Sequence, residues 1–277
     1  MRVPMRISFP QGKIRALTFS YDDGVVQDKR LVEIFNKHGL KGTFNINGAC
    51  YNSAPQDPTY GRMTKESAIA LFKDSGHEVA IHGFTHAWLS KLDSAGIVHE
   101  ITEDRRQLEA DFGRIVRGMA YAYGAYNDTV INILDMCGIA YARTTTTTHN
   151  FNFPQNWLEW NPTCHHKDPK LMELAENFLA PPRNSWRAPV LFYVWGHSYE
   201  FDDMDNWNVI EEFAEFMGGR EDIWYATNME IYEYVQAYNR LVTSYDKTFV
   251  YNPSNITVWF WHQGKDYCVE PGQTITL

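Results

Sequence analysis

The feature that most constrains this chain is the alternation of short apolar runs, rich in β-branched and aromatic residues, with amphipathic helical patterns. A chain that alternates strand and helix in this way folds as a parallel α/β structure. The predicted strands are IRALTFSY, GTFNI, HEVAIH, GMAYAY, IAYA, PVLFYVWG and IWYAT, and segments such as DKRLVEIFNKHG and MEIYEYVQAYNRLV predict helices after them. Roughly seven strands of this kind indicate a barrel-like α/β architecture.

Two parts of the chain depart from this alternation. Residues 144–167 have no clear period and predict a long loop, which inside a compact domain is usually functional or mobile. Residues 246–277 carry turn pairs and period-2 runs without a helical pattern. We therefore expect a barrel over residues 1–245 and an antiparallel β segment over residues 246–277 that packs on it.

Composition narrows the classes of partner. The formal net charge is −9 and no basic block offsets it, which argues against nucleic acid. No apolar run approaches the ~20 residues of a membrane-spanning helix. The opening MRVPMRISFP lacks the apolar stretch of a secretory signal, so we expect a cytoplasmic protein unless a signal was removed. The widely spaced cysteines are expected to be reduced core thiols: Cys50, Cys137, Cys164 and Cys268.

Ionisable side chains stand where predicted strands end, which is where a parallel barrel builds its active site. The first strand ends in Asp22 and Asp23, the third ends at His82 with His86 four residues later, and the sixth leads to His197. Each signal alone is weak, because adjacent aspartates before a glycine are often only a turn. Their joint placement at strand ends predicts one shared site.

This set resembles the polysaccharide deacetylase superfamily, also called carbohydrate esterase family 4 or the NodB-homology domain. SYDDG, ending at Gly24, is similar to that family's motif T-F-D-D-G, and HGFTH is similar to H-(S/T)-x-x-H, with Gly83 in the hydroxyl position. VWGH resembles the last motif, L-x-x-H. The resemblance covers roughly residues 14–240 and implies an α/β fold, a distorted (β/α)7 barrel, with the C-terminal β segment as an appendage.

The resemblance implies a metal-dependent hydrolase that removes acetyl groups from N-acetylated or O-acetylated carbohydrate. Asp23, His82 and His86 would hold Zn²⁺, or another divalent transition metal such as Co²⁺. Two imidazoles and a carboxylate leave positions open for water and substrate, as a catalytic zinc site requires. A metal-activated water would attack the acetyl group, with Asp22 as general base and His197 as general acid.

The third motif of the family, R-x-P-Y-G, is only partly present as AYAYG. Tyr123 matches the tyrosine whose backbone amide would bind the oxyanion, and its ring is a candidate for substrate contact. Ala120 and Ala122 replace the arginine and the proline. Arg143, at the end of the fifth predicted strand, is expected to reach the base Asp22 in place of the missing arginine.

The fourth motif, D-x-x-D-W, has a faint echo in NWLEW, so Trp160 is expected to wall the sugar pocket and Trp195 to contact substrate. A carboxylate near His197 would hold its tautomer and raise its pKa. The candidates are Glu159, Glu200 and Asp202. The run CHH, Cys164 to His166, is interpreted as loop structure near the site, because adjacent histidines rarely point to one centre.

Two other functions remain open at this stage. The same metal site would serve a hydrolase of another non-peptide C–N bond, such as a formamide or a cyclic amide. A carbohydrate-binding protein that has lost catalysis is the other possibility, and the missing arginine of the third motif motivates it. The sequence does not specify the substrate, the native metal, the oligomeric state or the role of the C-terminal segment.

Overall fold

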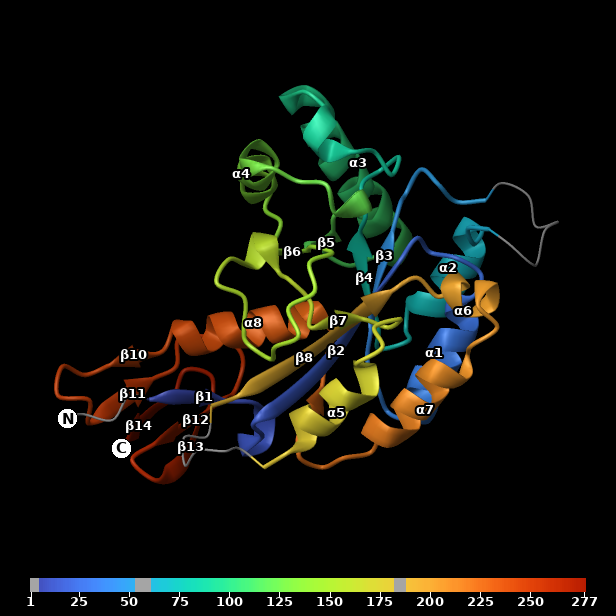
Figure 1. Ribbon diagram of the computed structural model, residues 1–277. Coiled ribbons are helices and arrows are strands. Elements are labelled where there is room, and N and C mark those ends of the chain that lie inside the picture. Colours follow the sequence, from blue (N-terminus) through green and yellow to red (C-terminus); the bar gives the residue numbers. More distant parts are fainter. Residues whose placement is uncertain (1–4, 53–60, 182–187) are drawn as a thin grey trace.

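The computed structural model describes residues 5–52, 61–181 and 188–277 and is built around one parallel sheet (Figure 1). Its strands run in the order β6-β5-β4-β3-β2-β8-β7, and β9 pairs with β2. Their bounds are β2 Arg15–Asp22, β3 Thr43–Ile46, β4 Glu78–Ile81, β5 Gly118–Ala120, β6 Tyr141–Arg143, β7 Cys164–His165, β8 Val190–Gly196 and β9 Ile223–Tyr225. The expected distorted (β/α)7 barrel is confirmed.

Strand β2 lies at the centre of this sheet and is buried along its whole length. β8 pairs with it from Arg15 to Tyr21, while β9 pairs with its first half and β3 with its second half. Because all these strands are parallel, their carboxyl ends meet at one edge of the sheet. That edge receives the side chains that follow β2, β4, β6, β7 and β8.

Helices surround the sheet, with α1 packed beside α7 and α3 beside α4 (Figure 1). Several begin at polar N-cap residues whose side chains accept a backbone N–H of the first turn: Thr64 for α2, Asp93 for α3 and Asn127 for α4. The helices are α1 Asp28–Lys37, α2 Lys65–Phe72, α3 Ser94–Phe112, α4 Asp128–Met136, α5 Leu171–Leu179, α6 Tyr199–Asp203, α7 Asn208–Met217 and α8 Asn228–Asn239.

The structure corrects the prediction of a featureless loop over residues 144–167. Cys164 and His165 form β7, which pairs in parallel with Val194 and Trp195 of β8. Over the described residues the parallel sheet therefore has eight strands, one more than the sequence pattern indicates. A two-residue strand is too short to show a period, so it exists only because β8 offers an edge to pair with.

The C-terminal segment is antiparallel β structure, as expected, but it recruits strands from outside residues 246–277. One sheet joins β1 (Arg6–Ser8) to β12 (Val258–His262) and β13 (Lys265–Val269). The other joins β10 (Val242–Thr243), β11 (Phe249–Tyr251) and β14 (Thr274–Thr276). Figure 1 shows β1 lying among these C-terminal strands. The division of the chain at residue 245 stays a prediction.

The expectations for the cysteines and for membrane-spanning segments have different outcomes. All four cysteines are free, but only Cys164 is buried and Cys268 is exposed, so a core position is wrong for Cys268. No helix in the described residues is long and apolar enough to cross a membrane. Residues 1–4, part of the stretch considered for a signal, lie outside the described residues.

Candidate active site

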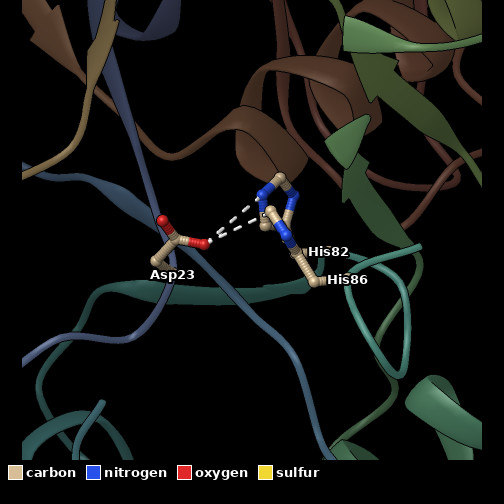
Figure 2. A group of neighbouring side chains, drawn as sticks. All are labelled: Asp23, His82 and His86. Atoms are coloured by element: carbon tan, nitrogen blue, oxygen red, sulfur yellow. Dashed lines mark ion pairs between the residues drawn. The ribbon is translucent and has the colours of Figure 1, made fainter. Parts of the chain in front are cut away.

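Three ligand-type side chains from the ends of β2 and β4 converge on one point, as Figure 2 shows. Asp23 Oδ1 lies 3.8 Å from His82 Nε2 and 3.5 Å from His86 Nε2. Ligand atoms on a tetrahedral zinc ion, each at about 2.0–2.2 Å, are about 3.4 Å from one another. The separations and the donor set, two imidazoles and a carboxylate, therefore fit one metal ion of the zinc type.

The backbone around these ligands adopts conformations that few residues tolerate. Asp23 has a φ of 85° and His86 a φ of 60°, both in the left-handed region. Strain of this kind costs about 1–3 kcal/mol per residue and clusters at functional sites. Gly83 has a φ of 81°, which explains why glycine stands where the family motif has a hydroxyl residue. The turn aims His82 and His86 at the same carboxylate.

A hydrogen bond sets the His82 imidazole for metal binding, and both rings stay uncharged. His82 Nδ1 lies 2.8 Å from the Ala120 carbonyl, which can only accept, so Nδ1 carries the hydrogen and Nε2 keeps a free lone pair. His86 Nδ1 lies 3.0 Å from the Tyr123 hydroxyl. Burial lowers the pKa of His82, and burial with the neighbouring His82 lowers the pKa of His86 to about 4. Both rings are therefore neutral near pH 7, as metal ligands must be.

Asp22 is buried beside the three ligands and is held by Arg143. Arg143 Nη2 donates to both carboxylate oxygens, and Asn45 Nδ2 donates to Oδ1 at 2.8 Å. Burial raises the pKa of Asp22, but Arg143, His82 and His197 outweigh it and bring the pKa well below its usual range. The expected contact between Arg143 and Asp22 is present, and it keeps Asp22 anionic.

His197 follows β8 on the other side of Asp22. Its Nε2 lies 3.8 Å from Asp22 Oδ2, and its Nδ1 lies 3.6 Å from Glu200 Oε2. Burial lowers the pKa of His197, but Glu200 and Asp22 outweigh it, so the net pKa is raised. Of the three carboxylates proposed as its partner, the described contacts favour Glu200.

The other two candidates are engaged elsewhere. Glu159 Oε2 accepts a hydrogen bond from Asn156, and Asp202 accepts from Gln27 and from the Trp207 indole. Neither makes a described contact with His197. The sequence offered no means of ranking the three, because which carboxylate approaches a ring depends on how α6 and the preceding loops fold.

The CHH run lies near the site, as expected, but its interpretation as loop structure with divergent histidines is wrong. His165 and His166 both aim Nε2 at Glu200 Oε2, each at 3.2 Å, and His165 belongs to strand β7. Adjacent strand residues normally point to opposite faces, but strand β7 ends at His165, and the chain turns there. The two rings therefore converge on one carboxylate.

The aromatic predictions have different outcomes. Trp160 is only 1% exposed and packs among Tyr141, Trp157 and Tyr193, so its assignment to the sugar pocket wall is wrong. Trp195 is also buried, with the Arg143 guanidinium 4.3 Å from its ring. Its predicted role in substrate contact stays untested.

Tyr123 is 54% exposed and stacks on Trp88, which is 45% exposed, with ring centroids 4.6 Å apart. Sequence reasoning missed Trp88, although it stands two residues after His86.

Three polar residues that support the ligands also escaped the sequence analysis. Arg62 Nη2 forms an ion pair with Asp23 Oδ1 at 2.9 Å. Asn47 Nδ2 donates to the carbonyls of His82 and Gly83. Asp104, inside α3, accepts the His82 backbone N–H at 2.9 Å. No motif marks these residues, because their partners lie far away in the sequence.

Comparisons with known proteins also match part of this chain to polysaccharide deacetylases. Residues 10–142 match the family model of polysaccharide deacetylases. A chitin deacetylase of Pestalotiopsis sp. is 30% identical over 124 residues, which cover 44% of this chain and 38% of that protein. A chitin deacetylase of Arthroderma benhamiae is 37% identical over 121 residues, 42% of this chain and 29% of that protein. The match thus covers well under half the length of either relative.

Solved structures support the fold. A Mycobacterium smegmatis protein assigned to the polysaccharide deacetylases aligns over 86% of this chain and 96% of its own, with a TM-score of 0.60 and 19% identity. The Xyl-CE4 domain of a multidomain xylanase from the hindgut metagenome of Trinervitermes trinervoides aligns over 81% and 92%, with a TM-score of 0.50 and 18% identity. At such identities the likeness concerns architecture alone.

Proposed function

Because this chain belongs to the polysaccharide deacetylase superfamily, we propose that it is a metal-dependent hydrolase that removes acetyl groups from N-acetylated or O-acetylated carbohydrate. One observation carries the proposal: Asp23, His82 and His86 converge, and Asp22 and His197 lie beside them. A protein that only bound sugar would have no use for an acid and a base flanking a ligand set.

Asp23, His82 and His86 would hold the metal, which when bound lowers the pKa of a water molecule and polarises the acetyl carbonyl. Asp22 is the proton acceptor. Arg143 keeps it anionic at every working pH, and Asn45 fixes the carboxylate plane. A carboxylate with so low a pKa is a weak base, and it can deprotonate only an unusually acidic water. Asp22 can therefore act as the base only beside the neighbouring ligand set.

His197 is the proton donor to the leaving nitrogen or oxygen. Its raised pKa keeps a larger fraction protonated near neutral pH than a free imidazole would have. Asp22 and Glu200 flank its two ring nitrogens and fix the ring plane. The base Asp22 and the acid His197 are therefore neighbours, with Asp22 Oδ2 3.8 Å from His197 Nε2. At this separation both groups can act on the same scissile bond.

The exposed pair of Tyr123 and Trp88 supports a carbohydrate substrate. Their stacked rings offer flat apolar surface beside the ligands, since Tyr123 contacts His86 directly. Aromatic faces of this kind contribute most of their binding energy through buried area. The backbone amide of Tyr123 stays our candidate for oxyanion binding.

Two alternatives differ in their support. The missing arginine of the third motif was the reason to consider a protein that binds carbohydrate without catalysis. Arg143 contacts Asp22 in place of that arginine, so this reason no longer applies. Hydrolysis of another non-peptide C–N bond uses the same groups, and only the substrate panel separates it from deacetylation.

The test is acetate release from chitooligosaccharides and from acetylated plant polysaccharide. We expect release that a chelator abolishes and Zn²⁺ or Co²⁺ restores. Asp23→Asn should lose at least about 100-fold in kcat/KM, because it removes a ligand charge, whereas the exposed control Asp74→Asn should match the wild type. Metal-loaded protein that releases no acetate from the whole panel, yet cleaves a formamide or cyclic amide, would replace the proposal with the alternative.

A further inference from the structure

A second group of ligand-type side chains lies next to the first. His165 Nε2 is 3.2 Å and His197 Nδ1 is 3.6 Å from Glu200 Oε2, and the three ligand atoms all lie within 4.8 Å of one another. The two distances to Glu200 lie close to the ~3.4 Å between ligands of a tetrahedral zinc ion. We propose that His165, His197 and Glu200 form a second divalent-metal site for Zn²⁺ or an ion of similar preference, of which only His197 lies in a matched motif.

The hydrogen bonding of the ligand atoms supports metal binding. His197 Nδ1 is buried and makes no hydrogen bond to any described residue, and Glu200 Oε2 is 3.6 Å away. Lys167 Nζ holds the other carboxylate oxygen, Oε1, at 2.6 Å, while Oε2 accepts the His197 backbone N–H at 3.3 Å and faces the histidine rings. A buried ring nitrogen without a partner is costly, and a bound cation would satisfy it.

A packed histidine ring lies against the carboxylate, at the place that outer groups occupy in metal sites. His166 Nε2 lies 3.2 Å from Glu200 Oε2, and the ring is stacked against Tyr21 and Phe201. Gly196 makes room for it, because a Cβ there would lie 2.1 Å from His166 Nδ1. The ligands therefore stand on a strand end, the turn after β8 and a short helix that are packed together.

Occupancy of this site would change the chemistry, because His197 is shared. Its Nε2 faces Asp22, while its Nδ1 belongs to the second set. With a metal on Nδ1, His197 is a neutral imidazole, and its remaining N–H is a much weaker acid than an imidazolium. The second ion would thus inhibit the enzyme that the first ion activates. This consequence rests on the proposed function, whereas metal binding does not.

Metal stoichiometry tests the site directly. We would titrate metal-free protein with Zn²⁺ and with Co²⁺, following bound metal by elemental analysis and cobalt absorption. The wild type should bind two equivalents, His165→Gln one, and the exposed-histidine control His99→Gln two. A wild type that saturates at one equivalent, or a His165→Gln protein that keeps both, would refute the second site. If His165→Gln does not fold, His82→Ala decides: it should retain one equivalent, and retention of none refutes the site.

Inhibition is measured separately. Excess Zn²⁺ should inhibit the wild type and His99→Gln, while His165→Gln should need at least about tenfold more zinc for the same loss. Equal sensitivity of all three would refute the inhibitory role. If no substrate is ever turned over, the proposed function fails while the stoichiometry still decides the site.

Discussion

The contact between Arg143 and Asp22 is the interaction whose loss should be most informative. Both side chains are buried, and Arg143 Nη2 donates to both oxygens of the carboxylate. Arg143→Met removes the charge while keeping most of the side-chain volume against Trp195. Removing one partner of a buried ion pair typically costs about 3–5 kcal/mol, because the other charge is left uncompensated.

The pH dependence of that loss follows from the pKa of Asp22. In the wild type Arg143 depresses this pKa, so the pair stabilises the fold above the unfolded pKa of about 4 and loses this contribution as the pH falls. In Arg143→Met the largest effect opposing burial is lost, and we expect burial to outweigh the remaining effects of His82 and His197 and to raise the Asp22 pKa, so that ionisation of Asp22 destabilises the fold as the pH rises above about 4. The stability gap between the two proteins should therefore widen from pH 4.5 to pH 7.5, by about 1.4 kcal/mol for each unit by which the Asp22 pKa exceeds 4.5.

Urea unfolding of metal-free protein at the two pH values measures this gap. The matched control is Arg143→Met combined with Asp22→Asn, which removes the unpaired charge and should recover stability at pH 7.5 relative to Arg143→Met alone. An equal loss for Arg143→Met at both pH values, or no recovery in the double variant, would show that the pair is not the source of the effect.

Two further predictions concern the acid and the sugar surface. Glu200→Gln should lower the pKa of His197, since Glu200 raises it, and should move the alkaline limb of the kcat profile to lower pH; an unmoved limb would contradict this. Trp88→Ala should raise KM for an oligosaccharide about threefold to tenfold with little change in kcat, because it removes stacking surface outside the reacting groups. Tyr245→Ala, at a fully exposed position between β10 and β11, is the aromatic control and should leave KM unchanged.

The sequence alone determined the architecture and the positions of the main ionisable groups. Strand and helix periods are local properties, and parallel strands bring their carboxyl ends to one edge whatever the details of packing. Asp22, Asp23, His82, His86 and His197 each stand just after such a strand, so their meeting followed from topology. The glycine at position 83 was visible but unexplained until its φ of 81° was known.

Only the tertiary structure decided which side chains contact one another in the site. Arg143 reaches Asp22 across 121 residues of chain, and the choice of Glu200 over Glu159 depends on where α6 lies. Trp160 is buried because the strands around it close over it, and β7 exists because β8 presents an edge. Contacts of this kind depend on the order of strands in the sheet and on the mutual packing of loops, which no local period or motif encodes.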